Sequence, residues 1–109
     1  MSTWLVRLRP TRFALLTDST PEEQAAVGRH FAYLQELTRQ GIVHLAGRTT
    51  SVEEEGMGIV ILSAPDEEQA RALMESDPAV AAGVFTARLF PYRLALLNTD
   101  SLTEAQRAG

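Results

Sequence analysis

The sequence predicts an α+β domain, in which four strands form one antiparallel sheet and two helices cover one of its faces. Apolar residues alternate or run together, as they do in strands, over residues 3–9, 42–48, 58–64 and 84–92. Segments with helical spacing follow the first and the third of these strands, over residues 20–41 and 65–76. Right-handed crossovers turn the order β-α-β-β-α-β into the ferredoxin-like arrangement.

The first strand is expected to have two different faces. Its side chains alternate between Trp4, Val6 and Leu8 on one side and Leu5, Arg7 and Arg9 on the other. Pro10 ends the strand because proline supplies no N–H to the ladder. The following segment is expected to be a loop, in which residues 12–16 either extend or flank the strand.

The first helix carries clear start and stop signals. Thr20 is a candidate N-cap, Pro21 suits the first helical position, and Glu23 completes a capping box with Thr20. Gly41 is suited to end the helix. The expected apolar stripe consists of Val27, Phe31, Leu34 and Leu37.

The later elements follow from similar signals. Residues 49–57, with three glutamates at 53–55, are typical of a solvated acidic turn. Pro65 is expected to begin the second helix, and Asp77 before Pro78 predicts a short capped turn of helix over residues 77–83. We expect one domain over residues 1–95 and a C-terminal tail over residues 96–109.

The strand over residues 58–64 is apolar on both faces. Ile59 and Ile61 point to one side of the sheet, whereas Val60 and Leu62 point to the other. Two helices can cover only one side, so another layer must cover the second. We therefore predict a homodimer in which two copies pack sheet against sheet.

Composition excludes several classes of function. The 109 residues carry a net charge of -4, which argues against a broad basic face for nucleic acid or anionic lipid. There is no cysteine, so disulfides and thiolate metal sites are excluded. The sequence shows neither a signal peptide nor an apolar segment of membrane-spanning length, and we expect a soluble, cytoplasmic protein.

His30 is the leading candidate for a reactive group. At about 100° per residue it lies about 60° from Val27 and about 40° from Leu34, on the buried side of the first helix. Imidazole is suited to proton transfer near neutral pH, but a histidine at the edge of a core can also serve packing alone. Asp77 has two readings as well: it either caps the following turn or orients an imidazole.

Three other residues carry charge or metal-binding capacity. Arg7 and Arg9 lie on a central strand, where they reach the sheet rim, pair with acids, or line a cavity that binds an anionic ligand. His44 is expected to share a face with Ile42 and Ala46. A metal site of His30 and His44 lacks a third ligand at a helpful spacing, and we predict no metal and no cofactor.

The order of these segments resembles the YCII-related family. The resemblance covers about residues 3 to 92 and rests on "RHFAYLQELTRQGIVHLAGR" and "GIVILSAPDEEQARALMESDPAVAAGVF". Its marks are a histidine in the first helix, a strand that ends in glycine, and "DPA" before the last strand. Where related sequences often show Gly-Pro, this chain has Gly47-Arg48, which changes the rim of the implied pocket.

The resemblance implies a dimeric α/β barrel, similar to muconolactone isomerases, with a site built around a histidine and an aspartate. The matching positions here are His30 and Asp77. It also implies lyase, isomerase or dehalogenase-like chemistry on small ring compounds.

Two hypotheses follow. The first is a cofactor-independent enzyme in which His30 transfers protons, Asp77 orients it, and Arg7 or Arg9 anchors a small acidic substrate. The second is a non-catalytic dimeric module that binds a metabolite or a partner protein, with His30 and Asp77 serving the fold alone.

Overall fold

The computed structural model describes every residue except Val52, Glu54 and Gly109. The elements are β1 (Ser2–Pro10), a 3-10 turn η1 (Phe13–Leu16), α1 (Pro21–Arg39), β2 (Val43–Arg48), β3 (Gly58–Ala64), α2 (Glu67–Glu75), α3 (Pro78–Ala81), β4 (Phe85–Tyr92) and α4 (Thr99–Ala108). The strands form one sheet in the order β2-β3-β1-β4, and every neighbouring pair is antiparallel. This arrangement confirms the predicted α+β, ferredoxin-like fold class.

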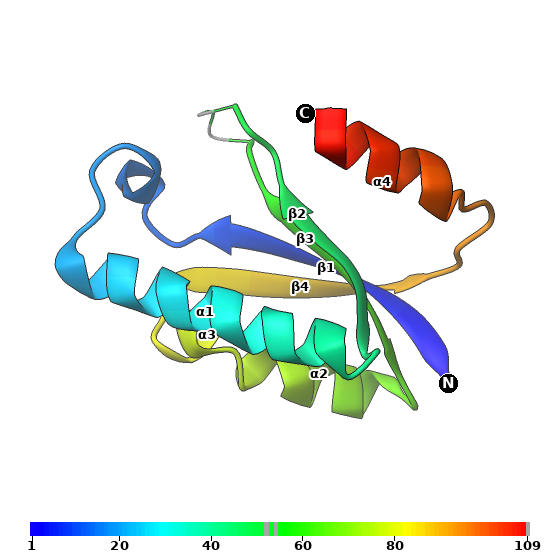
Figure 1. Cartoon of the computed structure of the whole chain (residues 1–109). Helices are drawn as coiled ribbons and strands as arrows, with labels where there is room; N and C mark the ends of the chain where they lie inside the picture. The colour runs from blue at the N-terminus through cyan, green and yellow to red at the C-terminus, as the bar shows by residue number, and fades with distance from the viewer. Residues whose placement is uncertain (52, 54, 109) are drawn as a thin grey trace.

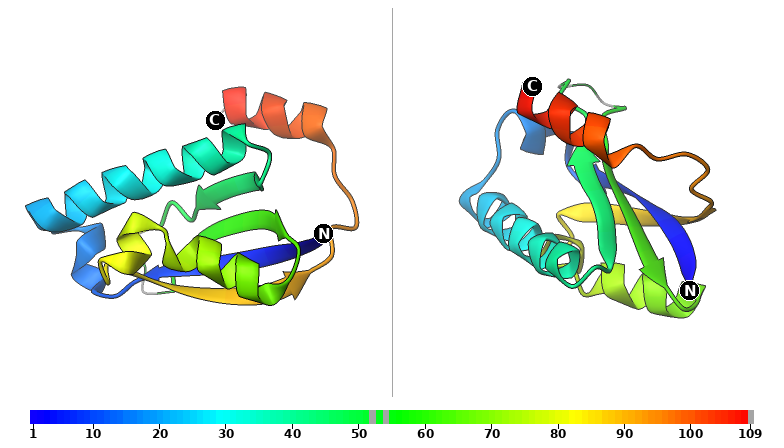
Figure 2. Two further views of the ribbon diagram at one scale, coloured as in Figure 1. Left: turned by 90° about the horizontal axis from the view of Figure 1, so that it is seen from below. Right: turned by 45° about the vertical axis from the view of Figure 1, so that its right-hand side comes forward.

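The helices α1 and α2 lie side by side on one face of the sheet, and α4 lies apart from both (Figures 1 and 2). The core fills the space between these helices and the sheet. Trp4, Val6 and Leu8 of β1 point into it, as the alternation in the sequence predicts. We call this the inner face of the sheet and the opposite side the outer face.

The first helix begins as the sequence predicts. Thr20 accepts a hydrogen bond from the N–H of Glu23, whose side chain accepts from the N–H of Thr20. The expected stripe is partly wrong, because Phe31 is 66% exposed while Ala26 is buried. The fully buried residues of α1 are Ala26, Leu34 and Leu37, so the second half of the predicted stripe is confirmed, whereas Ala26 is buried in place of Phe31.

Three further boundaries differ from expectation. α2 begins at Glu67 rather than Pro65, because the side chain of Asp66 accepts the N–H of Gln69 and caps the helix. The segment after β1 contains the turn η1, and the tail contains the helix α4. The expected acidic turn over residues 49–57 includes Val52 and Glu54, which lie outside the described residues.

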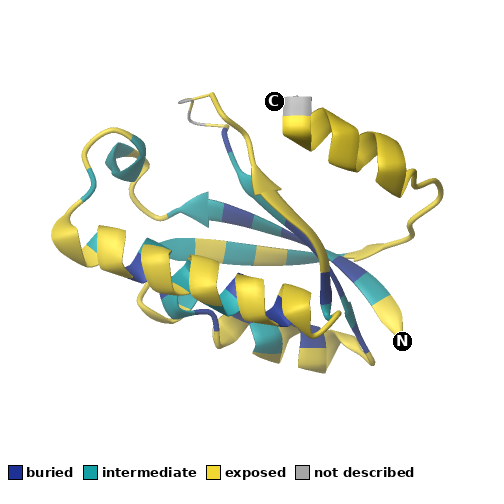
Figure 3. Ribbon diagram, in the orientation of Figure 1, coloured by how far each residue is buried: buried dark blue, intermediate teal, exposed yellow. Residues whose placement is uncertain are grey.

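Burial differs sharply along the chain (Figure 3). The middle of β1 and β3 is buried, whereas the described side chains of α4 are all exposed. Before α4, Leu94, Leu96 and Leu97 are also exposed. No described helix is long and apolar enough to cross a membrane.

Candidate active site

His30 and Asp77 meet between α1 and the start of α3, although 47 residues separate them. The Nδ1 atom of His30 lies 2.6 Å from Oδ2 of Asp77. The side chain of Asp77 is fully buried, and that of His30 is 14% exposed. A buried carboxylate is costly without a partner, so this contact is a large part of what makes Asp77 tolerable at this position.

The two carboxylate oxygens of Asp77 make different contacts. Its Oδ1 atom accepts the N–H of Ala79, 2.8 Å away, and caps α3. Its Oδ2 atom contacts the imidazole. Pro78 at the first helical position has no N–H that needs an acceptor. The cap uses Oδ1 and the imidazole uses Oδ2, so the two contacts do not compete.

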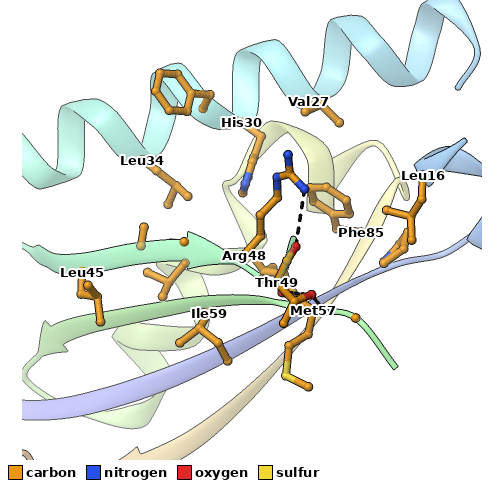
Figure 4. Close-up of a pocket in the computed structure, with 18 of the residues that line it drawn as sticks. Leu16, Val27, His30, Leu34, Leu45, Arg48, Thr49, Met57, Ile59 and Phe85 are labelled. Carbon is orange, nitrogen blue, oxygen red and sulfur yellow. Dashed lines mark hydrogen bonds between the residues drawn. The ribbon is translucent and has the colours of Figure 1, made fainter. Parts of the chain in front are cut away.

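The imidazole also faces a cavity of about 760 Å³, which we call the His30 cavity. It lies between α1, the turn η1 and the strands β2 and β3 (Figure 4). Most of its lining is apolar. The apolar side chains that point into it include Leu16, Val27, Leu34 and Phe85.

The orientation of the His30 ring is fixed on two sides. Asp77 holds Nδ1, and the ring of Phe85 lies edge to face against the imidazole with centroids 5.1 Å apart. Among the described residues, Nε2 of His30 has no hydrogen-bond partner, and it is the nitrogen left for a ligand in the cavity. The arrangement suits transfer of a proton through Nε2, with a carboxylate behind the ring.

Tyr33 of α1 links this helix to α2. Its hydroxyl donates to the carbonyl of Leu73 over 2.6 Å and joins α1 to α2. Burial raises the pKa of Tyr33, and the negative charge of Asp77 raises it further. The phenol therefore stays protonated and acts as a donor beside the carboxylate.

The sheet separates Arg7 and Arg9 from the His30 cavity. Both lie on the outer face, because Val6 and Leu8, their neighbours in β1, point into the inner core. Neither arginine lines the cavity. Arg7 and Arg88 approach the ring of Phe90 on the outer face, at 5.8 and 4.9 Å from its centroid.

The sequence predicted that His44 shares a face with Ala46, and this prediction is wrong. The pairing register shifts between Val43 and Leu45, so a bulge at this point turns Ala46 to the inner face. Nε2 of His44 contacts the hydroxyl of Ser63 at 2.7 Å. In the part of the chain that the structure describes, no three His, Cys, Asp or Glu residues gather in a possible metal site.

Sequence reasoning missed two residues of the cavity. Phe85 is the first residue of β4, and nothing in its local pattern indicates contact with a histidine 55 residues earlier. Arg48 was noted only as a departure from Gly-Pro, yet its side chain points into the cavity toward α1 (Figure 4). The replacement of Gly-Pro by Gly47-Arg48 was the only feature of the sequence that pointed to Arg48.

Solved structures similar to this chain include the following two. The first is TftG of Burkholderia phenoliruptrix AC1100, a 5-chloro-2-hydroxyhydroquinone dehydrochlorinase solved in complex with 2,5-dihydroxybenzoquinone. It is 19% identical with a TM-score of 0.62, over 84% of this chain and 95% of that one. At this identity the likeness concerns the fold.

The second is protein SP2199 of Streptococcus pneumoniae, which is 12% identical over 94% of this chain and 98% of that one, with a TM-score of 0.42. A search of curated proteins gave no match. The model of the YCII-related domain matches residues 6–90, which include β2, β3, most of β4, the second half of β1 and both members of the His30–Asp77 contact. This chain therefore belongs to the YCII-related family.

Proposed function

We propose that this protein is a small-molecule enzyme that works by proton transfer without a cofactor. His30 acts as general base and general acid through Nε2, and Asp77 orients the ring and stabilises its protonated form. One observation carries the proposal. The imidazole is tied at Nδ1 to a fully buried carboxylate while it lines a mostly apolar cavity.

The size and lining of the cavity favour a small ring compound as substrate. A volume of about 760 Å³ lies within the range of about 300–1,000 Å³ that is common for small-molecule sites. The fold neighbour TftG acts on a chlorinated hydroxyhydroquinone. We carry from it only a substrate class, hydroxylated or enolisable rings, in which a carbon-bound proton can be removed and returned.

Arg7 and Arg9 are not part of the proposed substrate site, since they lie on the outer face. We propose instead that they belong to a homodimer interface. Leu5 and Phe90 lie beside each other on that face, and the Nε atom of Arg9 is buried without a hydrogen-bond partner among the described residues. A second copy packed on this face would cover the apolar side chains and exclude water from them.

The test of the reaction is solvent deuterium incorporation into a panel of small ring compounds that includes 2,5-dihydroxybenzoquinone. Loss of a ring C–H signal in D₂O, followed by proton NMR, reports proton exchange at carbon. Wild type should accelerate exchange for at least one compound, and His30→Gln should reduce the rate by about 100-fold or more, the usual contribution of a general acid–base group. Equal rates for wild type and His30→Gln across the panel would contradict the proposal.

The alternative, a non-catalytic binding module, is favoured by one specific observation. Asp77 caps α3 and holds α1 through His30, so the pair has a structural use even without a reaction. In that case His30→Gln would lower the stability of the protein and leave the affinity for every panel compound unchanged. An imidazole that keeps one protonation state from about pH 5 to 8 would also favour the module.

A further inference from the structure

We propose that Arg48 makes the His30 cavity an anion-selective site, which binds a ring compound through a carboxylate or a pair of acidic ring oxygens. This inference rests on the proposed function for the location of the reacting atoms, but it concerns what the cavity binds. It starts from the composition of the lining. Among the described lining residues, the ionisable ones are His30, His44 and Arg48, and Arg48 alone carries a permanent charge.

The backbone places Arg48 firmly at the mouth of the cavity. It is the last residue of β2 and lies opposite Gly58 of β3. Because Gly58 has no side chain, nothing from that position stands between the guanidinium and the cavity. In Figure 4 the Arg48 side chain points toward α1, into the same space as the His30 ring.

The residues that follow Arg48 hold this end of the hairpin in place. The N–H of Thr49 donates to the carbonyl of Met57, and the N–H of Met57 donates to the Thr49 hydroxyl, at 2.9 and 3.0 Å. A Cβ atom at Gly56 would lie 3.0 Å from the same hydroxyl, so a larger residue there would crowd this contact. The base of Arg48 is therefore positioned before any ligand arrives.

The guanidinium of Arg48 lacks the acidic partner that three other arginines have among the described residues. Arg12, Arg39 and Arg71 each contact a glutamate. Arg48 has no acidic partner among the described residues, and its hydrogen bond is a long one, 3.5 Å to the carbonyl of Thr49. A cation at the mouth of an apolar cavity, with its hydrogen-bonding capacity largely unused, is available to an anionic ligand.

The chemistry of guanidinium determines which anions fit. Its planar fork donates two parallel hydrogen bonds to a carboxylate or to two adjacent oxygens on a ring. The apolar side chains behind it, including Leu16, Val27 and Phe85, match the face of a ring. An anion bound to Arg48 would place the body of the ring between the guanidinium and Nε2 of His30. Arg48 thus takes the anchoring role that sequence reasoning gave to Arg7 and Arg9.

The test compares two ring probes of similar size by isothermal titration calorimetry at low salt. The acidic hydroxyl groups of 2,5-dihydroxybenzoquinone make it an anion at neutral pH, whereas hydroquinone is uncharged. Arg48→Gln should weaken binding of the anion by about tenfold or more and leave hydroquinone unaffected, as expected for loss of a hydrogen-bonded charge. Arg48→Lys should retain part of the affinity, because it keeps the charge without the planar fork.

Arg29→Gln is the matched control. Arg29 is exposed on α1 next to His30 in sequence, it does not line the cavity, and its loss changes the net charge equally. Equal weakening by Arg48→Gln and Arg29→Gln would overturn the proposal, since it would reflect general attraction by the surface. A wild type that binds the anion no better than hydroquinone would also overturn it.

The two proposals can fail separately. Anion binding that depends on Arg48, with deuterium exchange equal in wild type and His30→Gln, would refute the reaction and leave the anion site. Exchange that depends on His30, without an effect of Arg48→Gln on anion affinity, would refute only the anion site. Circular dichroism and the unfolding midpoint should be unchanged in Arg48→Gln because the side chain is exposed.

Discussion

The two faces of the sheet share the strand β1 but differ in what the chain itself packs against them: α1 and α2 lie on the inner face. On the inner face, both oxygens of the buried Asp77 have a partner. Each face also holds one buried donor without a partner among the described residues, Nε1 of Trp4 on the inner face and Nε of Arg9 on the outer face. The outer face, where Leu5 lies beside Phe90, is the one on which we propose that a second copy packs.

The difference shows that burial has different consequences on the two sides. The inner face is sealed by elements of the same chain, so its charged groups had to be paired for the chain to fold at all. On the outer face, Arg7 and Arg88 approach the ring of Phe90 and need no acid while water remains nearby. Substitutions should therefore affect folding on the inner face and assembly on the outer face.

The largest expected effect is a loss of stability when the buried His30–Asp77 contact on the inner face is broken. His30→Ala leaves the Asp77 carboxylate without its partner and should lower the free energy of unfolding by about 3–5 kcal/mol. His44→Ala removes a contact with Ser63 at an exposed position and should cost less than about 1 kcal/mol. Denaturant unfolding of both variants measures the two costs. Similar losses of unfolding free energy in the two variants would show that the His30–Asp77 contact contributes no more to stability than an exposed hydrogen bond.

The next effect concerns assembly through the outer face. Leu5→Arg adds a cation beside the arginines of that face and should weaken the proposed dimer at least about tenfold, because like charges would meet across a two-fold interface. Sedimentation at micromolar concentration measures the change. Gln69→Arg, on the exposed side of α2, is the control and should leave the dimer intact. A wild type that sediments only as a 12.0 kDa species would refute the interface.

The smallest expected effect on stability concerns the exposed ion pair of Arg12 and Glu23, in contrast to the buried contact of His30 and Asp77. The hydrogen bond from Arg12 and the capping bond from the N–H of Thr20 lower the pKa of Glu23 from 4.5 to about 2. A lowered pKa stabilises the fold fully above about pH 4.5, and this contribution is lost as the pH falls toward 2. Arg12→Gln should raise the Glu23 pKa and weaken this acid dependence.

Carbon-detected NMR titration of the Glu23 carboxyl checks this pKa directly, and denaturant midpoints at about pH 5 and at lower pH check its effect on stability. Arg29→Gln should leave the Glu23 titration unchanged, since Arg29 has no contact with that carboxyl in the described structure. A Glu23 pKa that does not respond to Arg12→Gln would mean that the cap alone is responsible.

Much of the fold could be predicted because its signals are local. The capping box of Thr20 and Glu23 determines where α1 begins, and the alternation in β1 determines which side chains enter the core. Both depend on residues that are neighbours in sequence and on periods fixed by backbone geometry. The errors occurred where a competing local signal was stronger, as at Asp66, which caps α2 in place of the expected start at Pro65.

The site was less predictable than the fold. The sequence nominated His30 and Asp77, and the structure puts them in contact, but their catalytic role stays a prediction. The arginine in the cavity is Arg48 rather than Arg7 or Arg9. The bulge near His44 shifts the register of β2, and such a shift depends on pairing with β3 that the sequence of β2 alone does not show.

By itself, the sequence determined the four strands, the helices between them, their order and the two faces of β1, because hydrophobic period and capping act within a few residues. It did not indicate η1 or α4. Only the tertiary structure decided which charged groups share a space. The crossover that carries α3 back beneath α1 brings Asp77 to His30 across 47 residues, and the sheet, one layer thick, keeps Arg7 and Arg9 apart from them. Contacts between distant residues depend on chain packing, and no local pattern encodes the distance between them.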